Sequence, residues 1–295
     1  MPDLTPCCEL VGRLLPFDCL QARFMQQALL GLLLLAPMAA AMGVQVVNLR
    51  MAFFADAISH SAFAGVAMGL ILAVSPHWTM PVFAVLIGWG IMAVQRRSQL
   101  SVDTVIGVFF SGVVAFGLAM VSRNRQVARD LQRFLYGDIL TITDAEIFCL
   151  VGLFVALAAF QALAFNRMLY IGLNPTLARA HRVRVTLHEY LFATLLALVV
   201  IFSVWAVGVL LVTALLIVPA ATARNLARSA GAMFWWALVV SVSSAIAGLL
   251  ISAQEWAQTA TGATVILCAC VWFCGSLAMA TLGRWRRGRE SERSS

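Results

Sequence analysis

Two side chains that can bind a metal ion lie four residues apart inside an apolar stretch of the sequence, Asp56 and His60. Asp56 is the only acid well inside any apolar run of the sequence, and His60 is the only histidine so placed. On a helix these positions stack on one face, so a carboxylate oxygen and an imidazole nitrogen can reach the same divalent ion. A structural hydrogen bond, in which His60 satisfies Asp56, is the alternative. The residue types and their spacing alone do not distinguish a metal site from a structural hydrogen bond.

The surroundings of the pair favour an ion pathway. A charged group at membrane depth costs at least about 2.5–3.5 kcal/mol on insertion scales, so it normally faces a cavity or a partner. Ser61, Gly65 and Gly69 repeat every four residues beside the pair, a pattern of small residues that lets another helix approach closely. Two ligands are too few for a closed zinc site, which has four, so the pair suits transit better than storage.

The composition requires a membrane protein. Of the 295 residues, 62% are hydrophobic and 11% are charged, against about 45–50% and 25% in soluble proteins. The mean hydropathy of +0.93 holds over the whole chain, so the apolar sequence is distributed and not confined to one anchor. We therefore predict an all-α, polytopic bundle of about eight to nine transmembrane helices in the lipid bilayer, since each span needs about 20 apolar residues.

The apolar runs set the expected spans. They cover residues 28–47, 52–74, 81–97, 104–122, 147–165, 190–223, 233–253 and 263–282. The run at 190–223 would form a helix about 50 Å long, too long for one span, so we expect a turn near residues 205–208. This predicts nine spans with the N-terminus outside and the C-terminus inside.

Arginine positions support this topology at most loops. The segment 166–188, Arg224 and Arg228 would share the inner side, as the positive-inside rule requires, whereas the arginine-rich segment 123–144 would lie outside against that rule. The expected organisation is an N-terminal extension at the membrane interface (1–27), one transmembrane domain (28–283) and a basic cytoplasmic tail (284–295).

Other residue types exclude several functions. All 20 basic residues are arginine, so the lysine of a phosphate-binding G-x-x-x-x-G-K-S/T loop is missing and any ATP must be bound by another chain. The net charge of +7 reflects arginines at the ends of apolar runs, which argues against nucleic acid as a partner. The seven cysteines show no C-x-x-C spacing and are interpreted as small apolar residues.

The motif around the pair resembles a known family. Residues 48–67 are similar to the R-x-x-F-x-x-D-A-x-S-H-x-x-x-x-G-x-A signature of the permease subunits of bacterial ABC importers for zinc, manganese and iron(II), which include zinc-uptake permeases. Further similar segments are residues 103–107, 134–140, 207–223 and 261–264. The resemblance runs in order over about residues 28–280 and implies the fold of a type II ABC importer permease.

The resemblance also implies partners and roles. The family's acid–histidine pair maps onto Asp56 and His60, in a homodimer of the bacterial cytoplasmic (inner) membrane. An ABC ATPase subunit would bind inside, and an extracytoplasmic metal-binding protein would deliver the ion. The segment expected to couple to the ATPase, within a loop at about 166–188, is Asn174, Pro175, Thr176, Leu177, Ala178 and Arg179.

Local sequence agrees with a short helix in this coupling segment, except at its end. A proline such as Pro175 is well placed in the first turn of a helix. The family usually has a glycine soon after the helix, where this chain has Ala180, His181 and Arg182. The end of the coupling helix therefore stays open.

Taken together, these features predict the transport subunit of an ATP-driven importer, not an enzyme, with no permanently bound cofactor. Zinc is the favoured cargo because the pair contains a nitrogen ligand and a dimeric site would be four-coordinate; manganese and iron(II) remain open. A proton-coupled secondary carrier is the rival that would need no ATPase. An intramembrane metalloenzyme would need a further metal ligand and a general base, and the sequence contains no H-E-x-x-H motif that would supply them. An importer of metal chelates would not need the acid–histidine pair.

Overall fold

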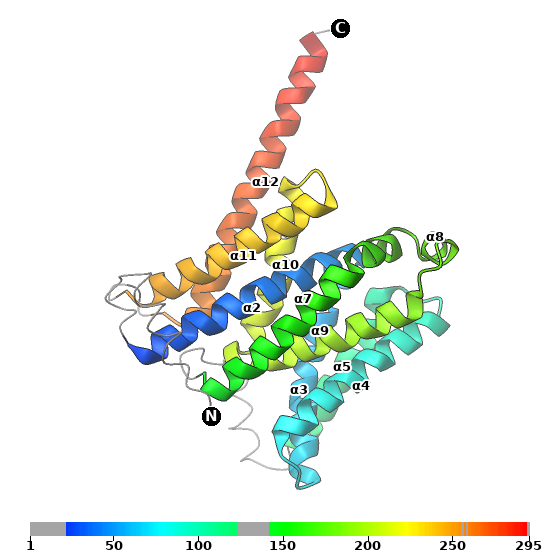
Figure 1. The fold of residues 1–295 in the computed structure, drawn as a ribbon, viewed down its shortest axis with the longest axis vertical. Coiled ribbons are helices and arrows are strands. Elements are labelled where there is room, and N and C mark those ends of the chain that lie inside the picture. The colour runs from blue at the N-terminus through cyan, green and yellow to red at the C-terminus, as the bar shows by residue number, and fades with distance from the viewer. Residues whose placement is uncertain (1–21, 123–141, 255–256, 258, 294–295) are drawn as a thin grey trace.

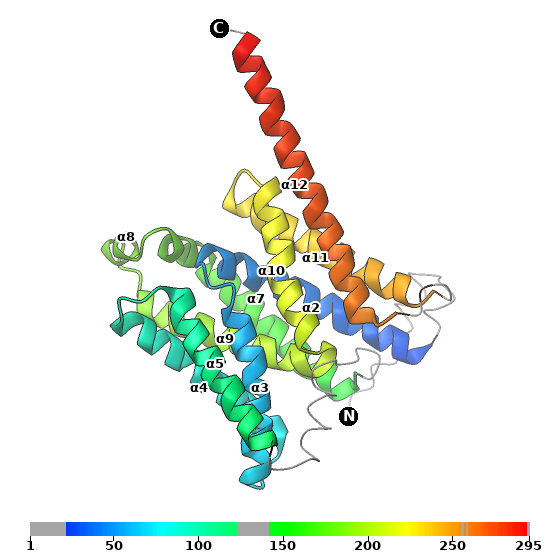
Figure 2. The same cartoon turned by 180° about the vertical axis from the view of Figure 1, so that it is seen from behind.

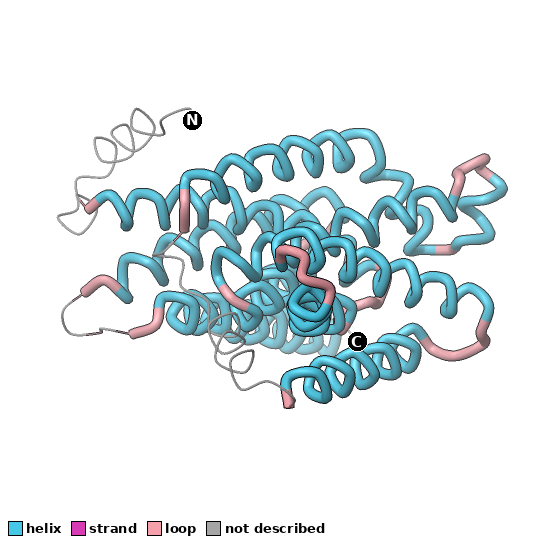
Figure 3. Tube along the Cα trace, turned by 90° about the horizontal axis from the view of Figure 1, so that it is seen from below, coloured by secondary structure: helices cyan, strands magenta, loops and turns pink. Residues whose placement is uncertain are grey.

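The described part of the chain is a bundle of helices joined by short loops (Figures 1 and 3). The structure is a computed structural model that describes residues 22–122, 142–254, 257 and 259–293. Its helices are α2 (Arg23–Asn48), α3 (Phe54–Ile71), α4 (Pro76–Arg97), α5 (Val102–Val121), α7 (Asp144–Leu173), α8 (Pro175–Ala180), α9 (Val185–Val207), α10 (Val209–Leu226), α11 (Ala230–Ser252) and α12 (Thr261–Arg293).

The prediction of an all-α membrane bundle is confirmed. Eight of the described helices, all except α3 and α8, are long and apolar enough to cross a membrane. Helix α3 has 18 residues, about 27 Å at 1.5 Å per residue, which is close to the hydrocarbon thickness of about 30 Å. With α3 counted, the described helices supply nine candidate spans, the number that the sequence predicted.

The turn expected near residues 205–208 is a single glycine. Helix α9 ends at Val207 and α10 begins at Val209, while Gly208 between them has φ 82° and ψ 165°. A side chain is strained at such a φ, and glycine is not. The long apolar run is therefore two helices, as its length required.

Local sequence signals begin several of the helices. Pro76 opens α4 at a position where its missing N–H costs nothing. The hydroxyls of Ser101 and Ser229 accept hydrogen bonds from the backbone N–H groups of Thr104 and Ala232, each at 3.2 Å. Thr143 forms a reciprocal capping box with Glu146 at the start of α7.

Helix α2 lies at the centre of one half of the bundle, packed against α7, α10 and α11 (Figures 1 and 2). The second half is α3 with α4 and α5, and α9 joins the two halves by packing against α4 and α7. Buried polar groups fasten α2 to its neighbours, because Gln161 of α7 donates to the Ala41 carbonyl and Ser241 of α11 to the Ala36 carbonyl, both at 2.8 Å.

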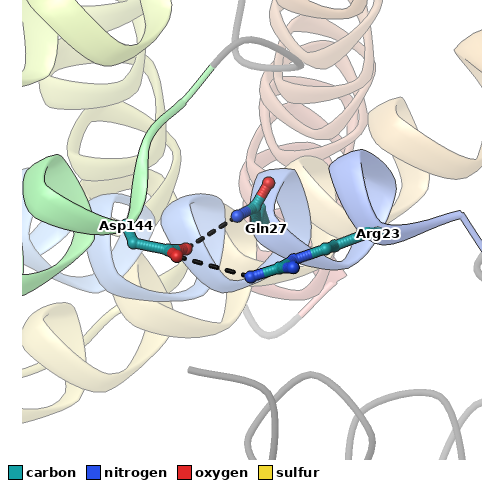
Figure 4. Close-up of polar contacts among 3 residues, drawn as sticks. All are labelled: Arg23, Gln27 and Asp144. Carbon is teal, nitrogen blue, oxygen red and sulfur yellow. Dashed lines mark hydrogen bonds and ion pairs between the residues drawn. The ribbon is translucent and has the colours of Figure 1, made fainter. Parts of the chain in front are cut away.

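A polar cluster ties the beginnings of α2 and α7 together (Figure 4). The Gln27 Nε2 donates to Asp144 Oδ1 at 2.7 Å, and Arg23 Nη2 lies 3.5 Å from Asp144 Oδ2. Both helices therefore begin at the same end of the bundle.

Two helix ends differ from the expected domain bounds. Helix α2 already begins at Arg23, so residues 23–27 belong to the bundle, and residues 1–21 lie outside the described part. Helix α12 continues to Arg293 and projects well beyond the other helices (Figure 2), so most of the expected tail 284–295 is helical.

Candidate functional site

Asp56 and His60 stand one turn apart at the start of α3. Asp56 lies in the first turn of the helix, where the free backbone N–H groups favour a negative charge. The neighbouring positions Phe54, Ala57 and Ile58 are fully buried and fix this face of α3 against the core. Asp56 and His60 themselves are half-buried, so the pair is held by the bundle and still accessible.

The pair faces side chains from two other helices. Thr213 of α10 and His60 both interact with the Asp56 carboxylate, while the Thr213 hydroxyl donates to the Leu210 carbonyl of its own helix at 3.3 Å. The His60 ring stands edge-on to Phe63, with ring centroids 5.4 Å apart, and to Phe110 of α5 at 5.1 Å. The site therefore lies where α3, α5 and α10 meet.

One chain presents too few ligands to close a metal site. Across the described residues, no group of three or more histidines, cysteines, aspartates or glutamates is close enough to hold an ion. The described cysteines, Cys149, Cys268, Cys270 and Cys274, are free thiols and lie outside any such group. The carboxylate and the imidazole of α3 thus form an open, two-ligand arrangement.

The small residues beside the pair lie against α4. A Cβ atom on Gly65 would come within 2.8 Å of the Met80 Cα, and one on Gly69 within 2.6 Å of the Thr79 Oγ1. Ser61 is buried and donates to the carbonyl of Ile58 within its own helix at 2.6 Å. The close neighbour that the spacing predicted is therefore α4, which packs along α3 over much of its length.

The segment predicted to couple to an ATPase forms the six-residue helix α8. The Asn174 Oδ1 accepts from the N–H groups of Thr176 at 2.9 Å and Leu177 at 3.2 Å, and Pro175 occupies the first turn. Within α8, Ala178 is buried, whereas Pro175, Thr176, Leu177, Arg179 and Ala180 are exposed. The helix is capped from within and offers most of its surface to a partner.

Helix α8 ends at Ala180, and the hydrogen bonds that follow it define this end. The N–H of Val183 bonds to the Ala178 carbonyl and that of Arg182 to the Arg179 carbonyl, both at 3.0 Å, which is a Schellman end. Arg182 has φ 59°, a left-handed conformation that costs a non-glycine residue of order 1–3 kcal/mol. Arginine thus fills the position that glycine would occupy without strain. Since α7 runs to Leu173 and α9 begins at Val185, the non-helical connection is shorter than 166–188.

One ionic contact was missed by the sequence reading. Glu189 of α9 lies 3.2 Å from the Arg96 Nε of α4, and its side chain is only 16% exposed. The long apolar run begins at Tyr190, so the sequence groups Glu189 with the polar residues before it. A lone acid directly before a long apolar run, among arginines, was the signal that could have identified it.

The remaining family-like segments fall at helix starts or within one helix. Residues 103–107 lie at the start of α5, 207–223 form most of α10, and 261–264 begin α12. The segment 134–140 lies outside the described residues.

Comparisons with known proteins agree with this architecture. The model of the ABC 3 transport family matches residues 21–280. The high-affinity zinc uptake system membrane protein ZnuB of Haemophilus influenzae is 34% identical over 251 residues, covering 85% of this chain and 95% of the relative. The manganese import system permease protein ScaB of Streptococcus parasanguinis is 31% identical over 260 residues, covering 88% and 92%.

A solved structure shares the fold. A chain of PsaBC from Streptococcus pneumoniae, solved in complex with Fab, superposes with a TM-score of 0.74 at 29% identity and covers 92% of this chain and 95% of that chain.

Proposed function

Because this chain is a multi-pass membrane protein of the ABC 3 transport family, we propose that it is the permease subunit of an ATP-driven importer of divalent metal ions, with zinc as the favoured cargo. The observation that carries the proposal is the half-buried Asp56–His60 pair where α3, α5 and α10 meet. The expected setting is the cytoplasmic membrane of a bacterium, with the arginine-rich ends of α4, α8 and α10 inside.

A homodimer would complete the metal site. One chain offers a carboxylate and an imidazole, and a second copy would double this to four ligands, the number that zinc binds in a tetrahedron. Two carboxylates would also balance the double positive charge of the ion in a medium where an uncompensated charge is costly. Separation of the two protomers would then divide the ligands and release the ion.

The rest of the cycle needs two further proteins. An extracytoplasmic binding protein would deliver the ion to the outer side, and ATPase subunits would bind inside. The exposed surface of α8 is the surface that we assign to the ATPase contact. ATP binding and hydrolysis would move α8 and so open the inner side of the dimer.

Ion identity is the finer part of the proposal. Imidazole and carboxylate ligands suit zinc, manganese and iron(II) alike, and the relatives named above include both a zinc and a manganese protein. We favour zinc because a nitrogen ligand from each protomer and a total of four ligands match its preferred site.

Uptake of labelled zinc into proteoliposomes tests this function. With the ATPase subunit and the binding protein present, we expect ATP-dependent zinc uptake that persists in the presence of equimolar manganese or iron(II). Preferential uptake of manganese would reverse the ion assignment. Uptake driven by a proton gradient, without ATP, would instead identify a secondary carrier.

Removal of the α8 cap tests the coupling role. Asn174→Ala removes the oxygen that accepts two backbone N–H groups, and loss of such a cap weakens a helix by about 0.5–2 kcal/mol. We expect a several-fold loss of transport and of metal-stimulated ATPase activity, with unchanged yield of the permease.

Two further variants serve as controls. Asn174→Asp keeps the acceptor oxygen and should retain most activity. Thr143→Ala removes the equivalent cap of α7 and should leave the coupling of transport to ATP hydrolysis unchanged. Equal activity of Asn174→Ala and the unmodified protein would argue against a role for α8 in coupling.

A further inference from the structure

Glu189 is an acid enclosed by arginines from two other elements. Its side chain is 16% exposed and belongs to the first turns of α9. The Arg96 Nε at the end of α4 lies 3.2 Å from Glu189 Oε2, and Arg179 of α8 attracts the same carboxylate electrostatically. One carboxylate thus interacts with both α4 and the exposed helix α8.

A cavity lies beside the ion pair of Glu189 and Arg96, so these side chains have space to move. A cavity of about 210 Å³ lies next to it and is lined by Pro175 at the start of α8 and by Glu189, Gln95 and Asn48. Buried polar atoms of Glu189 (Oε2), Gln95 (Oε1) and Asn48 (Nδ2) have no hydrogen-bond partner. The pairing of Glu189 with Arg96 is therefore ionic without hydrogen-bond geometry, and neighbouring polar atoms are free to take part when the groups move.

From Arg96 the connection continues to the metal pair. Helix α4 is joined to α9 again by the hydrogen bond from Trp89 Nε1 to Thr194 Oγ1, at 2.8 Å. The same α4 packs backbone-to-backbone against α3 at Gly65, where no Cβ atom fits beside Met80. Because α3 and α4 are packed this closely, a displacement of α4 would be expected to shift the helix that carries Asp56 and His60.

We propose that Glu189 is a positioning residue that couples α8 to α4, and through α4 to α3, through its ion pair with Arg96 and its position beside α8, where it shares a cavity with Pro175. The proposal rests on the proposed function, because it assigns to Glu189 the transfer of the ATPase-driven movement of α8 to the metal pair. Without the carboxylate, Arg96 would lose its ion-pair partner and Arg179 a nearby negative charge. ATP hydrolysis would then continue with less transport for each ATP.

The experiment measures the number of ATP molecules hydrolysed for each zinc ion transported, in proteoliposomes with the complete importer. Glu189→Gln keeps the shape of the side chain and removes its charge, and we expect at least a three-fold rise in this ratio with normal assembly of the complex. Arg179→Gln, at an exposed position, should raise the ratio similarly. The double variant should be no worse than Glu189→Gln alone, because both changes remove the same interaction.

Asp144→Asn is the matched control. It removes an acid paired with an arginine, Arg23, at the opposite end of the bundle, and it should leave the ratio unchanged. A loss of stability alone would lower the amount of complex in every variant without raising ATP consumption per ion.

Each outcome bears on a different claim. An unchanged ratio in Glu189→Gln, with coupled transport in the unmodified protein, would overturn the role of Glu189 and leave the proposed function intact. If Glu189→Gln does not assemble, a normal ratio in Arg179→Gln overturns the role instead. Absence of ATP-dependent uptake in the unmodified importer would overturn the proposed function, and this inference with it.

Discussion

Asp56→Ala and His60→Ala are expected to abolish metal uptake while the permease still folds and binds its ATPase. In the proposed homodimer, each change would remove two of the four proposed ligands, one from each protomer. Changes at groups that only support metal ligands already cost about 10–100-fold, so the loss here should be larger. Labelled zinc uptake into proteoliposomes, at equal amounts of assembled complex, measures the effect.

Controls of the same residue types separate the site from general effects. Asp144→Ala removes an acid at the polar cluster of α2 and α7, and His77→Ala removes a histidine that packs on Trp205 with ring centroids 4.8 Å apart. Both should retain uptake. Normal uptake by Asp56→Ala or His60→Ala, with intact ATPase coupling, would disprove the assignment of the pair.

The same site predicts sensitivity to acid. His60 must be neutral to offer a nitrogen lone pair, and bound metal competes with protons for both ligands. Uptake should therefore fall as the pH is lowered.

Gly43→Leu is expected to prevent formation of the folded bundle. A Cβ atom on Gly43 of α2 would overlap the backbone carbonyl of Leu216 in α10, and a backbone atom cannot rotate away as a flexible side chain can. Overpacking a core typically costs about 1–3 kcal/mol and occasionally more, and here two central helices must separate. We expect loss of the monodisperse species in detergent, or a lower melting temperature of the protein that remains.

Gly152→Leu is the matched control for this substitution. Gly152 is an exposed residue of α7, and an added Cβ atom there meets nothing within 4 Å. Its variant should melt at or above the temperature of the unmodified protein, because leucine is the better helix former. An unchanged melting temperature for Gly43→Leu would show that α2 and α10 do not cross as closely as described.

Features carried by chain length and residue type could be predicted from the sequence. The length of the apolar run 190–223 required a break, and Gly208 supplies it. Pro175, which suits the first turn of a helix, predicted the start of α8, whereas the capping role of Asn174 came only from the structure. Asp56 and His60 are candidates because a charged group within an apolar run normally faces a cavity or a partner, and their role in metal binding stays a prediction.

Features that depend on which helices meet could not be predicted. Membrane helices are apolar on most sides, so the sequence does not say that Gly65 lies against α4 or that Gly43 lies against α10. The left-handed backbone conformation of Arg182 could not be predicted from the sequence either. Arginine does not favour this conformation, and the Schellman hydrogen bonds impose it. Glu189 was missed for a related reason, since its partner Arg96 lies 93 positions away in the chain.

The one-residue joint at Gly208 leaves no slack between α9 and α10. Neighbouring Cα atoms are about 3.8 Å apart, so any larger axial displacement of α9 must also displace the start of α10. Glu189 lies near the end of α9 that is far from this joint, and Thr213, which interacts with the Asp56 carboxylate, lies in the second turn of α10 just past it. The Glu189 region and the Asp56–His60 pair are thus connected by a second route, along the covalent chain itself.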